Sequence, residues 1–318
     1  MVVNTEYERM ETVPGLFYEY TFNHLDVFTA VAGIRADYHN IYGAFVTPRM
    51  HLRYAPKEKT VFRASAGRGQ KTASIFAENI GLFASSRQIF IDDPVVDKPY
   101  GLDPEIAWNM GLNFSQGLMI FGREAVLNLD YYHTRFTNQI VVDYDMDPGE
   151  VHFYNLTGQS YSNSLQAQAD LEPLQRFDLR VAYRFNDVYA TYSDELMAKP
   201  FTSRHRAFIN LAYATFREWK FDFTWNWQGT KRIPGTLANP EEYQRPDSSP
   251  GFYVVNMQIS KKWPNSLEIY AGAENLFNYK QEDPIIASDD PFGEYFDASM
   301  IWGPVFGRKV YVGLRFEI

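Results

Sequence analysis

Residues 221–228 read Phe-Asp-Phe-Thr-Trp-Asn-Trp-Gln, so aromatic and polar side chains alternate along the whole stretch. Successive side chains of an extended strand point to opposite faces, and this period of two places all four rings on one face. A helix repeats every 3.6 residues and would scatter the same rings around its circumference. The stretch is therefore predicted to be a β-strand with one apolar face and one polar face.

The same alternation occurs in residues 177–185, 267–274 and 310–318. The polar faces of these stretches carry full charges, such as Arg180 and Glu268, and must meet water. The opposite faces are too aromatic for an ordinary soluble exterior, so they face either the core of a β-sandwich or lipid. Alternation alone leaves both architectures open.

The composition points toward a membrane. The 318 residues include 25 Phe, 22 Tyr and 6 Trp, which makes 17% of the chain aromatic, and such amphipathic rings are favoured at membrane interfaces. No run approaches the roughly 18 consecutive apolar residues that a spanning helix needs, which excludes helical membrane proteins. A membrane β-barrel needs no such apolar run, because its strands alternate lipid-facing and lumen-facing residues.

Charge and residue content exclude several classes of function. Lys and Arg number 30 against 39 Asp and Glu, and the net charge of −9 argues against nucleic acid as a partner. The absence of cysteine excludes disulfides, thiolate metal sites and a cysteine nucleophile. The six histidines show no close pair at ligand spacing, and no Ser/His/Asp set can be assembled from the sequence. We therefore expect no enzyme, no cofactor and no protein metal site.

The alternation and the turn signals predict about 13 strands, at approximately residues 12–22, 26–38, 45–55, 59–69, 104–117, 124–138, 158–171, 175–187, 201–216, 218–229, 250–262, 265–277 and 303–317. Tight links are predicted at 23–26, 55–58, 172–175, 217–218 and 263–265. The other links are mostly long, at roughly 70–103, 139–157, 188–200, 230–249 and 278–302, with a short exception near 39–44.

The two classes of link decide between the two architectures. Short turns at one rim and long loops at the other are typical of outer-membrane barrels, and a sandwich has no reason for this asymmetry. One strand with its link takes about 24 residues here, against roughly 8–12 in a sandwich. The sequence predicts an all-β fold: an antiparallel transmembrane β-barrel with short periplasmic turns and long extracellular loops.

The predicted barrel is expected to be incomplete. Single-chain bacterial barrels have even numbers of strands, whereas the predicted count is odd. Residues 1–10 show neither the basic region nor the apolar stretch of a secretory signal, although a barrel must be exported. We expect residues 1–318 to be the C-terminal part of a longer barrel, with the signal peptide and the first strands absent.

The strand end at 273–278 (Ala-Glu-Asn-Leu-Phe-Asn) and the terminal stretch 307–316 resemble the end of a TonB-dependent outer-membrane receptor of the Bacteroidota type. Residues 47–54 and 62–69 resemble its mid-barrel strand pair. Asp-Pro-Glu at 103–105 resembles the strand that follows its first large loop. The landmarks occur in the family's order and span nearly the whole chain.

The resemblance implies a barrel of roughly 22 strands around an N-terminal plug, of which this chain would supply about 13 strands and no plug. It implies an outer-membrane receptor that takes up a ferric siderophore or another metal chelate. The implied partners are TonB and the inner-membrane energising complex, the barrel-assembly machinery and lipopolysaccharide. The alternatives are an oligosaccharide importer of the same family, which would have a surface lipoprotein as partner, and a passive porin.

The last strand matches a polar-x-Gly-x-x-aromatic-x-hydrophobic pattern at Gly313, Phe316 and Ile318. This pattern resembles the signal that the barrel-assembly machinery reads. An apolar strand face, which a barrel needs in any case, is the alternative explanation of the same residues.

Nine residues in predicted loops or near the barrel mouth are candidates for ligand binding, because charged and aromatic side chains can grip a charged or aromatic ligand. They are Arg68, Arg87, Tyr100, Lys231, Arg232, Tyr243, Asp289, Asp290 and Trp302. The two aspartates belong to an acidic loop whose oxygens suit a hard cation or a metal chelate, although EF-hand spacing is absent. Lipopolysaccharide contact or loop solvation is the alternative for these side chains.

Overall fold

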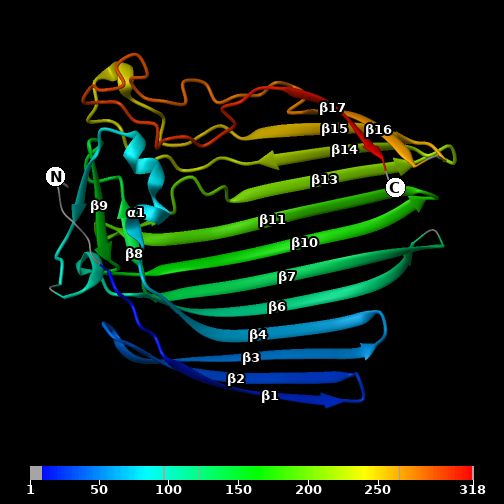
Figure 1. Cartoon of the computed structure of the whole chain (residues 1–318), viewed down its shortest axis with the longest axis horizontal. Coiled ribbons are helices and arrows are strands. Elements are labelled where there is room, and N and C mark those ends of the chain that lie inside the picture. The colour runs from blue at the N-terminus through cyan, green and yellow to red at the C-terminus, as the bar shows by residue number, and fades with distance from the viewer. Residues whose placement is uncertain (1–8, 96, 121, 265, 317–318) are drawn as a thin grey trace.

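The computed structural model describes residues 9–95, 97–120, 122–264 and 266–316. Within them, thirteen strands follow one another in chain order across one curved antiparallel sheet (Figure 1). They are β1 (Gly15–His24), β2 (Phe28–His39), β3 (Gly43–Lys57), β4 (Thr60–Lys71), β6 (Glu105–Ile120), β7 (Arg123–Asn138), β10 (Ser160–Leu174), β11 (Phe177–Tyr192), β13 (His205–Ala214), β14 (Trp219–Gln228), β15 (Phe252–Lys262), β16 (Leu267–Glu274) and β17 (Lys309–Phe316). Each predicted strand matches one of these, so the all-β antiparallel prediction is confirmed.

The links between strands fall at two different ends of the sheet, as predicted. Between β10 and β11 the turn consists of Gln175 and Arg176, and Arg176 adopts a left-handed backbone with φ of 65°. At the other end, residues 72–104 connect β4 to β6, and residues 275–308 connect β16 to β17 (Figure 1). We call the first end the turn end and the second end the loop end.

The register of the sheet assigns each strand residue to a face, because directly paired residues lie on the same side. Phe223 on β14 pairs with Leu211 on β13 and Met257 on β15. Thr224, the next residue, pairs with an asparagine on each of the same two strands. The predicted alternation is confirmed: one side of the sheet is apolar and the other polar, and we call them the outer face and the lumen face.

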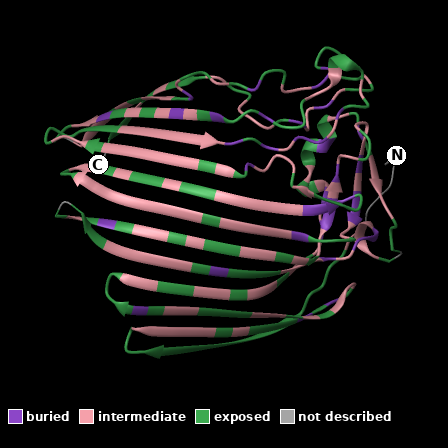
Figure 2. Ribbon diagram, turned by 180° about the vertical axis from the view of Figure 1, so that it is seen from behind, coloured by how far each residue is buried: buried purple, intermediate pink, exposed green. Residues whose placement is uncertain are grey.

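The sheet has two open edges among the described residues. β1 pairs only with β2, and β17 pairs only with β16. The thirteen strands therefore form part of a barrel wall rather than a closed barrel. Many outer-face side chains of this wall are exposed, including Leu112 at 58% and Leu165 at 50% (Figure 2 marks exposed residues in green).

The long loops contain structure that the alternation does not predict. Strands β5 (Gln88–Ile91), β8 (Ile140–Asp143) and β9 (Glu150–Asn155) form a second, three-stranded sheet, and β12 (Glu195–Ala198) extends the wall beside β11. The loops also hold helix α1 (Ile75–Glu78) and the 3-10 turns η1 (Ile80–Ala84), η2 (Pro99–Gly101) and η3 (Glu241–Tyr243). No helix among the described residues is long and apolar enough to cross a membrane.

These loops pack into a structure at the loop end that we call the cap, made of residues 72–95, 97–104, 139–159, 193–204, 229–251 and 275–308 (Figure 1). The largest completely buried side chains lie in the cap, with the exception of Val255 on β15. Val151 and Phe153 of β9 are both 0% exposed and pack with Leu102 in one apolar cluster. The cap thus has hydrophobic cores of its own.

Candidate ligand-binding site at the barrel mouth

Arg87 lies inside the cap, where its guanidinium joins three loops. Its Nε donates to Asp297 Oδ2 at 2.7 Å and its Nη1 to the carbonyl of Glu150 at 3.0 Å. The side chains of Arg87 and Asp297 are only 2% and 6% exposed. Because a buried ion pair with further hydrogen bonds is held in place, Arg87 supports the cap from inside rather than projecting from a loop.

Arg232 ties the cap in a similar way. Its Nη1 lies 2.9 Å and 3.0 Å from the two carboxylate oxygens of Asp145, and its Nε donates to the carbonyl of Ala198 at 2.6 Å. The guanidinium also lies over the ring of Tyr192, 5.3 Å from its centre. This ion pair, together with the bond to Ala198, fixes the relative positions of two loops and the end of β11.

Lys231 and Trp302, which the sequence analysis selected separately, meet in the structure. The Lys231 ammonium donates to the backbone carbonyl of Trp302 and lies 5.3 Å from the centre of the Phe252 ring. Burial and then the charge of Arg206 lower the pKa of Lys231. Trp302 packs on a buried cluster that includes Ile233. This group closes the cap over the start of β15.

Tyr243, Asp289 and Asp290 also come together, at the surface of the cap. The ring of Tyr243 stacks on Tyr295 at 5.4 Å between centres. Burial raises the pKa of Tyr243, and the charges of Glu242, Asp289 and Asp290 raise it further. Both aspartates are exposed. This corner of the cap is aromatic and negatively charged, and it faces solvent.

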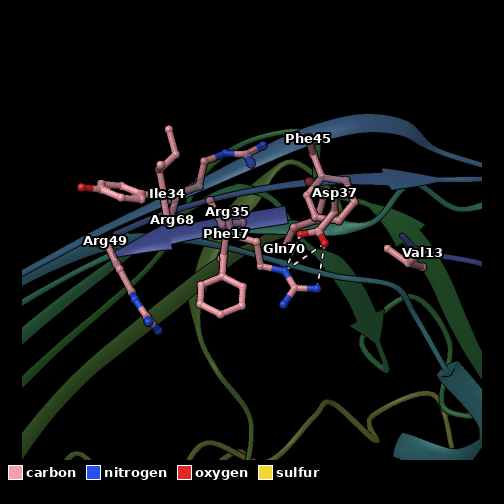
Figure 3. A pocket seen from close by; sticks show the side chains of 12 residues that line it. Val13, Phe17, Ile34, Arg35, Asp37, Phe45, Arg49, Arg68 and Gln70 are labelled. Atoms are coloured by element: carbon pink, nitrogen blue, oxygen red, sulfur yellow. Dashed lines mark hydrogen bonds and ion pairs between the residues drawn. The ribbon is translucent and has the colours of Figure 1, made fainter. Parts of the chain in front are cut away.

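Two further candidates lie elsewhere. Tyr100 is in η2 with a left-handed backbone (φ 56°), and its ring packs edge-on against Phe76 at 5.4 Å. Arg68 lies on β4 rather than in a loop, and its Nη1 donates to the carbonyl of Val46 at 2.8 Å. Figure 3 shows the Arg68 side chain on the outer face, whereas Arg49 and Phe17 lie on the opposite side of the strands. The structure therefore separates Arg68 from the mouth residues.

The lumen face below the cap carries a pair of arginines that the site prediction missed. Arg184 on β11 and Arg206 on β13 are directly paired, and both are exposed. Arg184 donates to the Gln166 side chain, and Arg206 makes no hydrogen bond or ion pair within the described part of the chain. The alternation of residues 177–185 put two arginines on one face, and that signal could have identified Arg184.

Acidic and histidine side chains do not assemble into a metal site in the described ranges, where no group of three or more could hold an ion. One cluster joins His152 to Asp92 and Glu150, each 3.0 Å from one ring nitrogen. Its geometry is that of a charged histidine between two carboxylates.

Comparison with known proteins agrees with this architecture. Residues 4–276, well over half of the chain, match the family described as TonB dependent receptor-like, beta-barrel. The chain belongs to this family. TonB-dependent receptors are outer-membrane transporters rather than enzymes, and this chain is part of an outer-membrane β-barrel of the family. No curated protein matches the sequence.

Several solved structures share the fold of this chain. The ferric enterobactin receptor PfeA of Pseudomonas aeruginosa, in complex with BCV-L6, is 15% identical with a TM-score of 0.67, over 96% of this chain and 45% of that one. The FrpB iron transporter of Neisseria meningitidis is 15% identical (TM-score 0.64; 96% and 44% covered), and the copper transporter OprC 14% (TM-score 0.68; 96% and 48%). The chain spans less than half the length of these structures.

The family landmark at residues 273–278 has a clear structural role. Asn275 and Asn278 adopt left-handed backbones, with φ of 51° and 59°, which asparagine tolerates well. Asn275 Nδ2 donates to the carbonyl of Tyr279 at 2.7 Å, and Asn278 Oδ1 accepts from the backbone N–H of Arg308 at 2.9 Å. The motif ends β16 and joins both ends of the last long loop.

The C-terminal pattern is partly visible. A Cβ added to Gly313 would lie 2.2 Å from Cζ of Tyr270, so glycine leaves room for that ring on the lumen face. Phe316 pairs with Leu267 on the outer face and is 59% exposed. Ile318 lies outside the described residues. Reading of this pattern by the barrel-assembly machinery remains a prediction.

Proposed function

We propose that the protein containing this chain is an active-transport receptor for a ferric siderophore or another anionic metal chelate. Membership of the TonB-dependent receptor family supports the transport class. The observation that carries the choice of ligand is the arginine pair on the lumen face, Arg184 and Arg206. TonB and its inner-membrane complex would supply the energy, and the barrel-assembly machinery would insert the wall.

The arginine pair is costly unless something compensates for it. Like charges directly opposite each other in a sheet destabilise the pairing. Some other lumen-face arginines are neutralised, as in the ion pairs of Arg180 with Asp170 and of Arg315 with Glu268. Arg53 and Arg63 also pair directly, but near the turn end, far from the mouth. The pair of Arg184 and Arg206 has no such carboxylate. The charge of Arg206 also lowers the pKa of Lys231 in the cap. A site of this kind favours a ligand whose oxygens carry negative charge.

The test is uptake of a radiolabelled ferric catecholate by cells that produce the protein with Arg184→Gln and Arg206→Gln together. We expect uptake to fall by roughly tenfold or more, because each lost charge-assisted bond contributes about 1.5–3 kcal/mol. Arg180→Gln is the matched control, since that arginine lies on the same strand and face but is already paired. Surface labelling checks that all variants reach the membrane. Unchanged uptake in the double variant would contradict the proposal.

Oligosaccharide import is the second candidate, and the exposed rings of the cap favour it. Phe292 is 100% exposed, close in sequence to Tyr295, which stacks on Tyr243. Aromatic faces of this kind suit sugar rings, and a surface lipoprotein would be the partner. Tyr243→Ala should then abolish growth on the sugar and leave chelate uptake unchanged. A steady open conductance of the whole protein would instead indicate a passive porin.

A further inference from the structure

Five outer-face residues form one row across five adjacent strands near the loop end. Arg68 on β4 pairs with Trp108 on β6, and Trp108 pairs with Arg135 on β7. Arg135 pairs with Tyr161 on β10, and Tyr161 pairs with Tyr189 on β11. We call this set the outer row. Direct pairing places all five side chains on the same face at the same height.

The outer row lies at the edge of the apolar band of the wall. On β7 the outer-face residues that precede Arg135 run back through Leu129 to Ala125 beside the turn end. About ten residues separate Ala125 from Arg135, or ~33 Å along the strand, and a strand tilt of about 35–45° reduces this to ~25 Å of height. That is about the height of the apolar band of an outer-membrane barrel. The row therefore sits where the lipid headgroups of the outer leaflet begin.

The charges of the row are not neutralised by the protein. Arg135 makes no hydrogen bond or ion pair among the described residues, and the hydrogen bond of Arg68 goes to the backbone carbonyl of Val46. No carboxylate belongs to the row. The acidic residue one step nearer the band, Asp187, is already paired with Arg204 at 2.8 Å. Two guanidinium groups thus face the membrane interface with their charge available.

The aromatic members complete a surface suited to an amphipathic ligand. Trp108 is 38% exposed and lies between the two arginines, and the rings of Tyr161 and Tyr189 stack at 5.7 Å. Tryptophan and tyrosine are favoured at headgroup level, and arginine binds phosphate with two parallel hydrogen bonds. The backbones of β4 and β7 are about 9–10 Å apart across β6, a span that two long side chains can close on one headgroup.

We propose that the outer row binds the phosphorylated glycolipid of the outer leaflet. Arg68 and Arg135 hold its phosphates, and Trp108 lies against its sugar and the start of its acyl chains. The site is distinct from the mouth, because the row faces away from the lumen. Arg68 thereby takes a role in the membrane anchorage of the wall.

The test is native mass spectrometry of the full chain, purified in detergent and titrated with bisphosphorylated lipid A. Arg68→Gln combined with Arg135→Gln should weaken binding by roughly 10–30-fold, since each basic side chain at an anionic surface contributes a several-fold factor. Arg63→Gln is the matched control: it lies on β4 but on the lumen face, bound to Asn113, and should leave binding unchanged. Retention of β-sheet circular dichroism checks folding.

Two ligand controls make the result decisive. Dephosphorylated lipid A should bind the unsubstituted chain about as weakly as phosphorylated lipid A binds the double variant. Inorganic phosphate at millimolar concentration should not displace the glycolipid. Equal binding of both lipids, equal binding by the double variant, or displacement by free phosphate would each overturn the proposal.

Discussion

The wall and the cap place their apolar side chains in opposite ways. In the wall, Leu112 and Leu165 are about half exposed, because the outer face is built to contact lipid. In the cap, Val151 and Phe153 are fully buried within a small core formed by separate loops. The membrane supplies the apolar surroundings of the wall, whereas the cap must provide its own by bringing distant loops together.

The two regions also treat charge differently. Lumen-face pairs such as Arg49 with Glu19 are largely exposed, at 57% and 39%, so water screens them and each contributes little to stability. The Arg87–Asp297 pair is almost completely buried and unscreened. We therefore expect the cap to depend on single ion pairs in a way that the wall does not.

Arg87→Met should have the largest effect, and it should be confined to the cap. The substitution leaves Asp297 buried and unpaired, which costs about 3–5 kcal/mol. Hydrogen exchange should accelerate in β5 and β9 and stay unchanged in β7 and β10. The double variant Arg87→Met with Asp297→Leu should recover most of the loss. If the wall loosened together with the cap, the two regions would not be independent.

A charge placed in the middle of the wall should distinguish its two faces. Leu129→Arg puts the charge on the outer face and should destabilise the barrel by about 2–4 kcal/mol. Asn128→Arg, one residue earlier on the lumen face, should cost less than about 0.5 kcal/mol because it meets water. Urea unfolding in lipid vesicles measures both values. Equal costs would show that the register assigns the faces incorrectly.

The smallest expected effect is a pH dependence confined to the cap. Burial lowers the pKa of His152, but the hydrogen bonds to Glu150 and Asp92 and their charges raise it more, and the net pKa is raised. The stabilisation by the charged ring is fully present below the ordinary value of about 6.5 and is lost as the pH rises through the raised value. After correction for the intrinsic rise of exchange with pH, the protection factors of β9 should fall above neutral pH. His152→Gln should remove this fall, and a fall that persists would assign it to another group.

The strands of the wall could be predicted because their signal is local. In residues 221–228 each aromatic residue is followed by a polar one, so the sequence alone shows which side chains face lipid. The register confirms the same faces across the neighbouring strands. The short strands of the cap gave no such signal, since β5 and β8 have four residues each. The pairing of β5 with β9 is parallel and joins two different loops, so no local pattern predicts it.

The candidate site was predicted as a set of residue types in loops, and the structure gave several of them definite contacts. Arg87, Lys231 and Arg232 hold the cap together, and their part in ligand binding stays a prediction. The alternation of β4 places Arg68 on the same face as Phe62 and Ala66, although the sequence analysis grouped it with the mouth. Loop length identified the region, but not the direction of each side chain.

The sequence by itself determined the wall: a period of two, dictated by backbone geometry, sets which residues meet lipid and which meet the lumen. Only the tertiary structure decided the cap and the outer row. Arg87 and Asp297 are 210 residues apart, and the members of the outer row come from five strands. Such neighbours are set by strand order, register and loop packing, which act between distant segments and leave no trace in the local pattern.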